Sequence, residues 1–157
     1  MADKQAIANK WYKSMCKMLD DRGWTYDKDE EKYKISCDVS GDNGSLDVRM
    51  YLDAEREVAI TWVFVGLKVP EDMRETVAHA VNVINYCLVH GAFDFGQEKG
   101  NLLYRCTSSY RDSVVSEEWF KYLIDVAVNT ADDYSEKLRR VVKGYLTVDE
   151  LYDELRK

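Results

Sequence analysis

The sequence is poor in the residues that build metal centres and disulfide frameworks. Its 157 residues include one proline, two histidines and four cysteines. His79 and His90 lie eleven residues apart on one predicted helix, so about 16 Å of helical rise keeps them from sharing an ion. No two cysteines are close enough in sequence to resemble zinc ligands. We predict no metal site, and we expect small buried hydrophobes at Cys16, Cys37, Cys87 and Cys106.

Signatures of catalysis are missing as well. The chain has no Gly-x-Ser-x-Gly elbow, no dinucleotide-binding glycine loop and no phosphate-binding lysine loop. The segment 38–49 loosely imitates a calcium-binding loop, but its glycine falls one position late and Arg49 replaces the closing glutamate. A pairing of Cys106 with His90 in three dimensions stays open, although a buried strand cysteine usually serves packing. We therefore predict that the protein is not an enzyme and uses no cofactor.

An excess of positive charge and long apolar runs are also absent. The chain has 22 Lys and Arg against 29 Asp and Glu, which gives a net charge of −7 with neutral histidines. This balance repels phosphate backbones and anionic lipids, so we expect neither nucleic acid nor a membrane as partner. No apolar run approaches the ~20 residues of a membrane span. The first residues do not resemble a signal peptide, so we expect a cytoplasmic protein. The acidity suits a basic partner or serves solubility alone.

The residues that are present indicate one α+β domain of ordinary size. Gly41-Asp42-Asn43-Gly44 marks a tight hairpin, and short turns between consecutive strands favour an antiparallel β-sheet flanked by helices. We assign residues 1–144 to the domain and residues 145–157 to a C-terminal helical extension. Hydrophobic periodicity predicts, in order, a helix at 3–22, strands at 24–26, 33–39, 45–53 and 57–65, a helix from Pro70 to Gly91, strands at 92–95 and 102–107, and helices at 116–144 and 148–156.

The C-terminal extension carries a clear helix-start signal. Thr147 and Glu150 are spaced as a capping box, and Leu146 with Leu151 is spaced as a hydrophobic staple. We expect this short helix to dock on the domain through Leu151 and Leu155. A detachable recognition helix is the alternative.

The strand at 57–65 is apolar on one face and uncharged on the other. A strand of this kind is usually covered on both sides, by a helix of the same chain or by a partner subunit. We assign Trp62 to the core, and we predict that the second face contacts a partner through Thr61, Val63 and Val65, together with Leu103.

Two further assignments concern the surface. Tyr51 shares its strand face with Asp47 and Arg49, so it is the better surface candidate among the aromatic residues. The acidic pair Asp132-Asp133 is assigned to a solvated face of the third long helix.

Four short segments carry a family resemblance: Leu19-Asp20-Asp21-Arg22-Gly23-Trp24, Val81-Asn82-Val83-Ile84-Asn85-Tyr86, Gly91-Ala92-Phe93-Asp94-Phe95 and Leu102-Leu103-Tyr104-Arg105. With the order of elements, they resemble the YbjN family over residues 5–143. The resemblance implies the fold of type III secretion chaperones and a non-enzymatic homodimer that binds other polypeptides. It also implies a loose link to regulation and stress, and it carries over no functional residue.

Two functions fit these features. The first is a chaperone-like or adaptor module, homodimeric and regulatory, that binds a partner protein. The second is an acidic inhibitor of a basic protein, such as an immunity protein to a nuclease toxin, which needs a concentrated carboxylate surface. High salt should weaken the inhibitor's complex strongly, whereas a wrapped apolar segment should resist salt.

Overall fold

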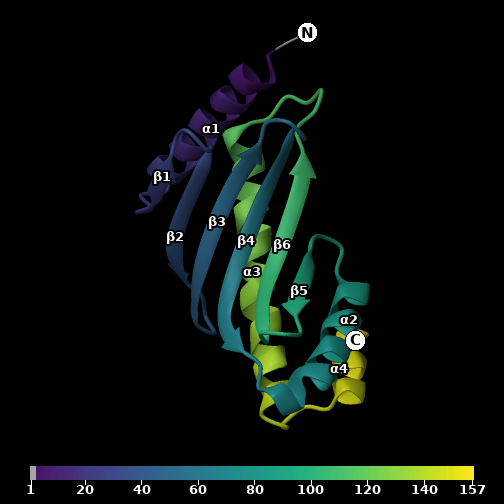
Figure 1. Ribbon diagram of the computed structural model, residues 1–157. Coiled ribbons are helices and arrows are strands. Elements are labelled where there is room, and N and C mark those ends of the chain that lie inside the picture. Colours follow the sequence, from purple (N-terminus) through teal and green to yellow (C-terminus); the bar gives the residue numbers. More distant parts are fainter. Residues whose placement is uncertain (1–2) are drawn as a thin grey trace.

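The computed structural model describes residues 3–157 as helices packed on one six-stranded antiparallel sheet (Figure 1). The strand order in the sheet is β1-β2-β3-β4-β6-β5. In chain order the elements are α1 (Lys4–Asp21), β1 (Asp27–Asp29), β2 (Lys34–Ser40), β3 (Ser45–Asp53), β4 (Val58–Lys68), the 3-10 turn η1 (Glu71–Met73), α2 (Arg74–Cys87), β5 (Ala92–Gly96), β6 (Asn101–Ser109), α3 (Glu117–Val142) and α4 (Val148–Leu155).

The predicted element order and the antiparallel sheet are confirmed, whereas several boundaries differ by a few residues. The strand predicted at 24–26 lies at β1 instead, because Trp24 packs against the core and pairing with β2 begins only after it. The helix predicted up to Gly91 ends at Cys87. Leu88 already has an extended backbone, and Gly91 takes a φ of 66° in the turn to β5. Glycine adopts this left-handed conformation without steric cost.

The two faces of the sheet have different surroundings. In Figure 1, α1 and α3 lie behind the strands, and α2 with α4 packs at the β5 side. One row of paired residues crosses five strands beneath the helices, and each member is at most 8% exposed: Cys37, Val48, Val63, Tyr104 and Phe93. Because strand side chains alternate, the residues between these positions point to the opposite, uncovered face.

Helix α3 provides most of the cover. The Ser116 hydroxyl caps it by accepting a hydrogen bond from the Trp119 amide at 3.2 Å. Acidic residues occupy the first turn and basic residues the last turn, which complements the helix dipole. The apolar stripe that faces the core consists of Phe120, Leu123, Ile124, Ala127, Ala131, Leu138 and Val141.

The β2–β3 hairpin is fastened to α3 by a buried carboxylate. Asp132, predicted to lie on a solvated face, is 6% exposed, because the hairpin tip folds onto the helix. Its carboxylate accepts hydrogen bonds from the backbone amides of Asp42 at 2.8 Å and Asn43 at 3.1 Å. Arg139 donates to the Asn43 carbonyl at 3.2 Å and to a β4 carbonyl at 3.1 Å. A Cβ atom at Gly41 would collide with this carboxylate, so the contact requires glycine there.

Both edges of the sheet are protected from pairing. On β5, the Asn85 side chain donates to the Phe93 carbonyl at 3.0 Å and accepts from the Phe93 amide at 2.8 Å. A carboxamide therefore occupies the place that the peptide group of a further strand would take. At the other edge, β1 is three residues long and every one of them is charged. Short and charged edges resist strand addition.

The C-terminal helix docks on α2, as expected. The capping box is formed: the Glu150 amide donates to the Thr147 hydroxyl at 3.2 Å, and the Thr147 amide donates to the Glu150 carboxylate at 2.8 Å. Leu151 is fully buried, and Arg140 pairs with Glu154 at 3.1 Å. The division into a domain at 1–144 and an extension at 145–157 stays a prediction, and residues 1 and 2 lie outside the described part.

We predict that Asp132→Ala lowers the free energy of unfolding by about 2 kcal/mol. The substitution leaves two amides of the hairpin tip without their charged acceptor, and such a loss costs roughly 1–3 kcal/mol. Urea denaturation measures it. Asp133→Ala, an exposed neighbour on the same helix, is the control and should change the value by less than about 0.5 kcal/mol. Equal effects of the two substitutions would contradict the clamp.

An open aromatic face as the candidate binding site

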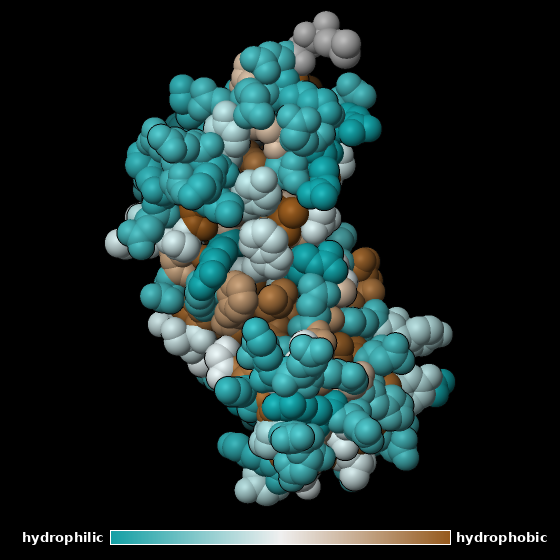
Figure 2. Space-filling model, in the orientation of Figure 1, coloured by the Kyte–Doolittle hydropathy of each residue, from teal (hydrophilic) through white to brown (hydrophobic). Residues whose placement is uncertain are grey.

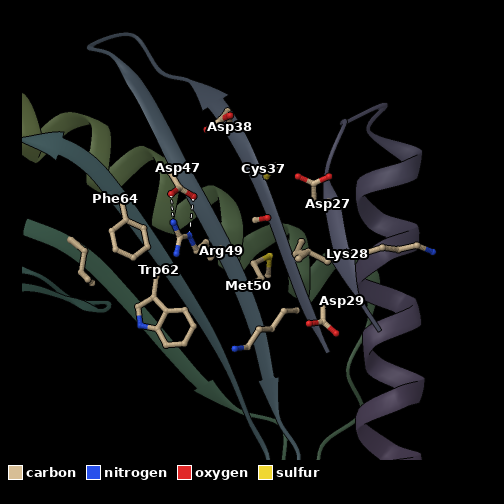
Figure 3. Close-up of a pocket in the computed structure, with 14 residues that line it drawn as sticks. Asp27, Lys28, Asp29, Cys37, Asp38, Asp47, Arg49, Met50, Trp62 and Phe64 are labelled. Atoms are coloured by element: carbon tan, nitrogen blue, oxygen red, sulfur yellow. Dashed lines mark hydrogen bonds and ion pairs between the residues drawn. The ribbon is translucent and has the colours of Figure 1, made fainter. Parts of the chain in front are cut away.

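The uncovered face of the sheet is hollowed into an open groove. The groove measures about 810 Å³ and is lined by β1, β2, β3, β4 and β6. Figure 2, in the orientation of Figure 1, shows pale and brown side chains over the middle of this face, with hydrophilic ones around them. Figure 3 shows the residues of the groove: Phe64 and Trp62 lie on one side, Asp27, Asp29 and Asp38 lie on the other, and Arg49 lies between them with Asp47 beside it.

The aromatic side chains of the open face, Tyr51 beside the groove included, are held by stacking and by cations. The rings of Tyr51 and Trp62 stack with centroids 6.2 Å apart and planes 7° apart. The Lys34 ammonium lies 5.1 Å from the Tyr51 ring centroid, and the Arg49 guanidinium lies 4.5 Å from the ring centroid of Phe64. Each such contact contributes about 0.5–1 kcal/mol at an exposed site. The rings therefore present an ordered surface rather than loose side chains.

The strand register arranges these residues in rows across the sheet. One row on the open face pairs Ser36, Arg49, Trp62 and Arg105 across β2, β3, β4 and β6. The neighbouring row runs from β2 to β5 through Asp38, Asp47, Phe64, Leu103 and Asp94. Apolar side chains thus occupy the centre of the face, and charged side chains flank them.

Charges of both signs are interleaved along the groove. Arg49 donates two hydrogen bonds to Asp47, at 3.1 and 2.6 Å, and this contact raises the pKa of the guanidinium. Arg105 binds Asp94 in the same way at 2.7 and 3.1 Å, and its pKa is likewise raised. Both arginines stay charged at any physiological pH, so the groove keeps its mixed character.

The buried strand thiols Cys37 and Cys106 do not have the low pKa of a nucleophilic thiol. Burial, with the nearby Asp38 and Asp47 charges, raises the pKa of Cys37 to about 11. Burial also raises the pKa of Cys106. Catalytic thiols show the opposite shift. The ring of His90 contacts the Tyr122 hydroxyl at 3.0 Å. Across residues 3–157, no three His, Cys, Asp or Glu side chains come together as metal ligands would.

The structure corrects most of the predicted interface. Thr61, Val63 and Val65 are 1% exposed or less, because their face of β4 lies under α3. They belong to the core, and a partner could reach them only if α3 left the sheet. Leu103 lies on the other face, half-buried, in the groove.

Trp62 is a second correction, because it lines the groove and is only partly buried. Alternation within β4 could not tell which of its two apolar faces is covered. The neighbouring strand held the missing signal: Asp47 and Arg49 pair with Phe64 and Trp62, and charged residues mark the solvent side. Tyr51, the predicted surface aromatic, does lie on this open face.

Comparisons with known proteins agree with this architecture. Residues 12–140 match the profile of the YbjN family, described as "Putative bacterial sensory transduction regulator". No curated protein gives a significant match to the sequence. Within the described chain, no helix combines the length and the apolar character that a membrane crossing requires.

Several solved structures are similar to the chain, among them the following three. YbjN from E. coli, "a putative transcription regulator", has a TM-score of 0.58 and 13% identity, over 78% of this chain and 86% of that one. The ExsC-ExsE complex has a TM-score of 0.56 and 15% identity, over 82% and 93%. The HopA1-SchA chaperone-effector complex has a TM-score of 0.55 and 14% identity, over 83% and 97%. At these identities the likeness concerns the fold, and the predicted chaperone-like fold is confirmed.

We predict that Cys37 titrates with a pKa of about 11. The measurement is the pH dependence of its alkylation rate in a variant whose other cysteines are replaced by serine. Asp38→Asn should lower this pKa, because removing a negative charge makes the thiolate less unfavourable. Asp133→Asn, on the helix side, should leave it unchanged. A Cys37 pKa near the ordinary 8.5 in the parent variant would contradict the burial of this thiol, and an unchanged pKa in Asp38→Asn would contradict the contribution of the Asp38 charge.

Proposed function

The chain belongs to the YbjN family, and on that premise we propose that it is a non-enzymatic, chaperone-like module that holds a segment of a partner protein against the open face of its sheet. The observation that carries this proposal is the ordered open face on which Trp62, Phe64 and Arg49 line the groove and Tyr51 stacks on Trp62. Tryptophan, tyrosine and arginine dominate the binding energy of protein interfaces.

The shape and composition of the groove support a polypeptide rather than a small substrate. The groove is open and extends across five strands, whereas small-molecule sites are concave and enclose most of their ligand. Its aromatic rings are already stacked in place, so binding would cost little side-chain entropy. Two of the similar structures are complexes with a partner, one of them a chaperone with its effector. This likeness supports a fold that can hold a polypeptide.

The alternative function, an acidic inhibitor of a basic protein, fits the open face less well. Such an inhibitor needs concentrated carboxylates, but the groove lining holds four aspartates together with three basic residues. Two of those basic side chains lie over aromatic rings, Lys34 and Arg49. We therefore favour the chaperone-like module, with a regulatory role through partner binding as the family description suggests.

A homodimer remains part of the proposal, but its contact must be reassigned. Of the residues predicted for it, Leu103 alone is accessible in the folded chain. A dimer built on Leu103 would cover the groove and exclude a partner segment. We therefore expect the two copies to meet outside the groove, so light scattering should give the same mass for wild type and Leu103→Asp. A dimer that is lost in Leu103→Asp would place the contact in the groove and contradict the partner-binding surface.

The direct test of the function is capture of partners from a lysate of the native host. Tagged wild-type protein, Trp62→Glu and a control, Tyr86→Glu, are compared after washing at high salt. Tyr86 is 82% exposed on α2, so its substitution adds the same charge outside the groove. We expect the same partner with wild type and control, and its loss with Trp62→Glu. Undiminished capture by a folded Trp62→Glu variant would refute the open face as the binding surface.

A further inference from the structure

Two carboxylates in the groove, those of Asp27 and Asp38, lack a counter-charge. Asp38 and Asp47 face each other directly across β2 and β3, an arrangement that destabilises a sheet unless it is compensated. Arg49 compensates Asp47. Asp38 is exposed and, like Asp27, has no ion-pair partner among residues 3–157. Both line the groove.

The nearby lysines are engaged elsewhere. Lys28 pairs with Glu30 at 2.7 Å, and in Figure 3 its side chain extends away from the carboxylates. The Lys34 ammonium lies over the Tyr51 ring. Asp27 pairs with Ser36 across β1 and β2, and Asp38 lies two residues further along the same face. Such diagonal positions are roughly 7–8 Å apart, a spacing that one lysine or arginine side chain can bridge.

The apolar part of the groove lies at a fixed distance from these carboxylates. Phe64 and Leu103 are directly paired on β4 and β6. Beyond them, Asp94 is neutralised by Arg105. Since neighbouring strands are about 4.8 Å apart, Asp38 on β2 lies roughly 10 Å from Phe64. In an extended chain, residues two or three positions apart span about 7–10 Å.

From this arrangement we infer that the partner segment carries a lysine or arginine two or three residues from apolar side chains. Its cation binds between Asp27 and Asp38, and its apolar side chains pack on Phe64 and Leu103. The inference rests on the proposed function and specifies its partner. Aromatic and arginine side chains on a sheet also suit single-stranded nucleic acid, but the unpaired carboxylates repel phosphates. A basic, partly apolar polypeptide segment satisfies both halves of the groove.

The test uses synthetic probes and the full chain. The main probe is a twelve-residue peptide with lysine and leucine two positions apart and serine elsewhere. One matched peptide has glutamate in place of lysine, a second has serine in place of leucine, and a dodecamer of deoxythymidine is the third comparison. Binding is measured by calorimetry and by the NMR shift of the Trp62 indole N–H. We expect the lysine-leucine peptide to bind and to shift Trp62, and each comparison probe to bind at least about tenfold more weakly.

Variants that replace one aspartate by asparagine test where the lysine ammonium of the peptide binds. Asp38→Asn should weaken binding of the lysine-leucine peptide about fivefold, since one charged contact is lost. Asp133→Asn, which removes the same charge on the helix side, should not weaken it. Equal effects of the two variants would overturn the placement of the cation at Asp38.

The probes separate failure of this inference from failure of the proposed function. Equal binding of the glutamate peptide would overturn the requirement for a basic residue and leave the function standing. Equal binding of the leucine-free peptide would show non-specific charge attraction and overturn the inference. Absence of peptide binding, while capture from lysate still depends on Trp62, would overturn the inference alone. Tight binding of the oligonucleotide at Trp62 would overturn both.

Discussion

The packing of α1 and α3 on a single face of the sheet is the constraint from which the other properties follow. Because strand side chains alternate, covering one face decides which residues form the core and which remain available. The row through Val48, Val63 and Tyr104 is sealed under the helices. The same register leaves Trp62 and Phe64 on the open side. A shift of one residue in the strand pairing would exchange the buried residues with those on the open face, so the register itself specifies which residues line the groove.

Polar contacts hold that register in place. Asp132 and Arg139 fasten the tip of the β2–β3 hairpin to α3, which fixes the helix relative to the strands that line the groove. The Asn85 side chain forms hydrogen bonds with the backbone amide and carbonyl of Phe93 at the edge of β5, so no further strand pairs there. These contacts lie outside the groove, yet they hold the hairpin tip and the β5 edge of the sheet that carries its aromatic rows. A rigid surface loses little entropy when it binds.

Local signals in the sequence predicted the elements well and the surfaces poorly. The capping box at Thr147 and the hairpin at Gly41-Asp42-Asn43-Gly44 depend on neighbouring residues, so the sequence was sufficient to place them. Asp132 could not be recognised as buried, because its partners lie about ninety positions away in the hairpin. The face of β4 was misjudged for a similar reason. Whether Trp62 or Val63 is covered depends on which face of the sheet α3 packs against. The only sequence signal for that face is the pair of charged β3 residues, Asp47 and Arg49, that lie opposite Phe64 and Trp62.

We propose that the sheet uses one face for its own core and keeps the other ordered for a partner. Hydroxyl-radical footprinting of the free protein and of its complex with a captured partner tests this division most directly. We predict that Trp62 and Phe64 are oxidised in the free protein and protected in the complex, while oxidation of the exposed Tyr86 is the same in both. Unchanged oxidation of Trp62 and Phe64 on binding, with protection elsewhere, would contradict it.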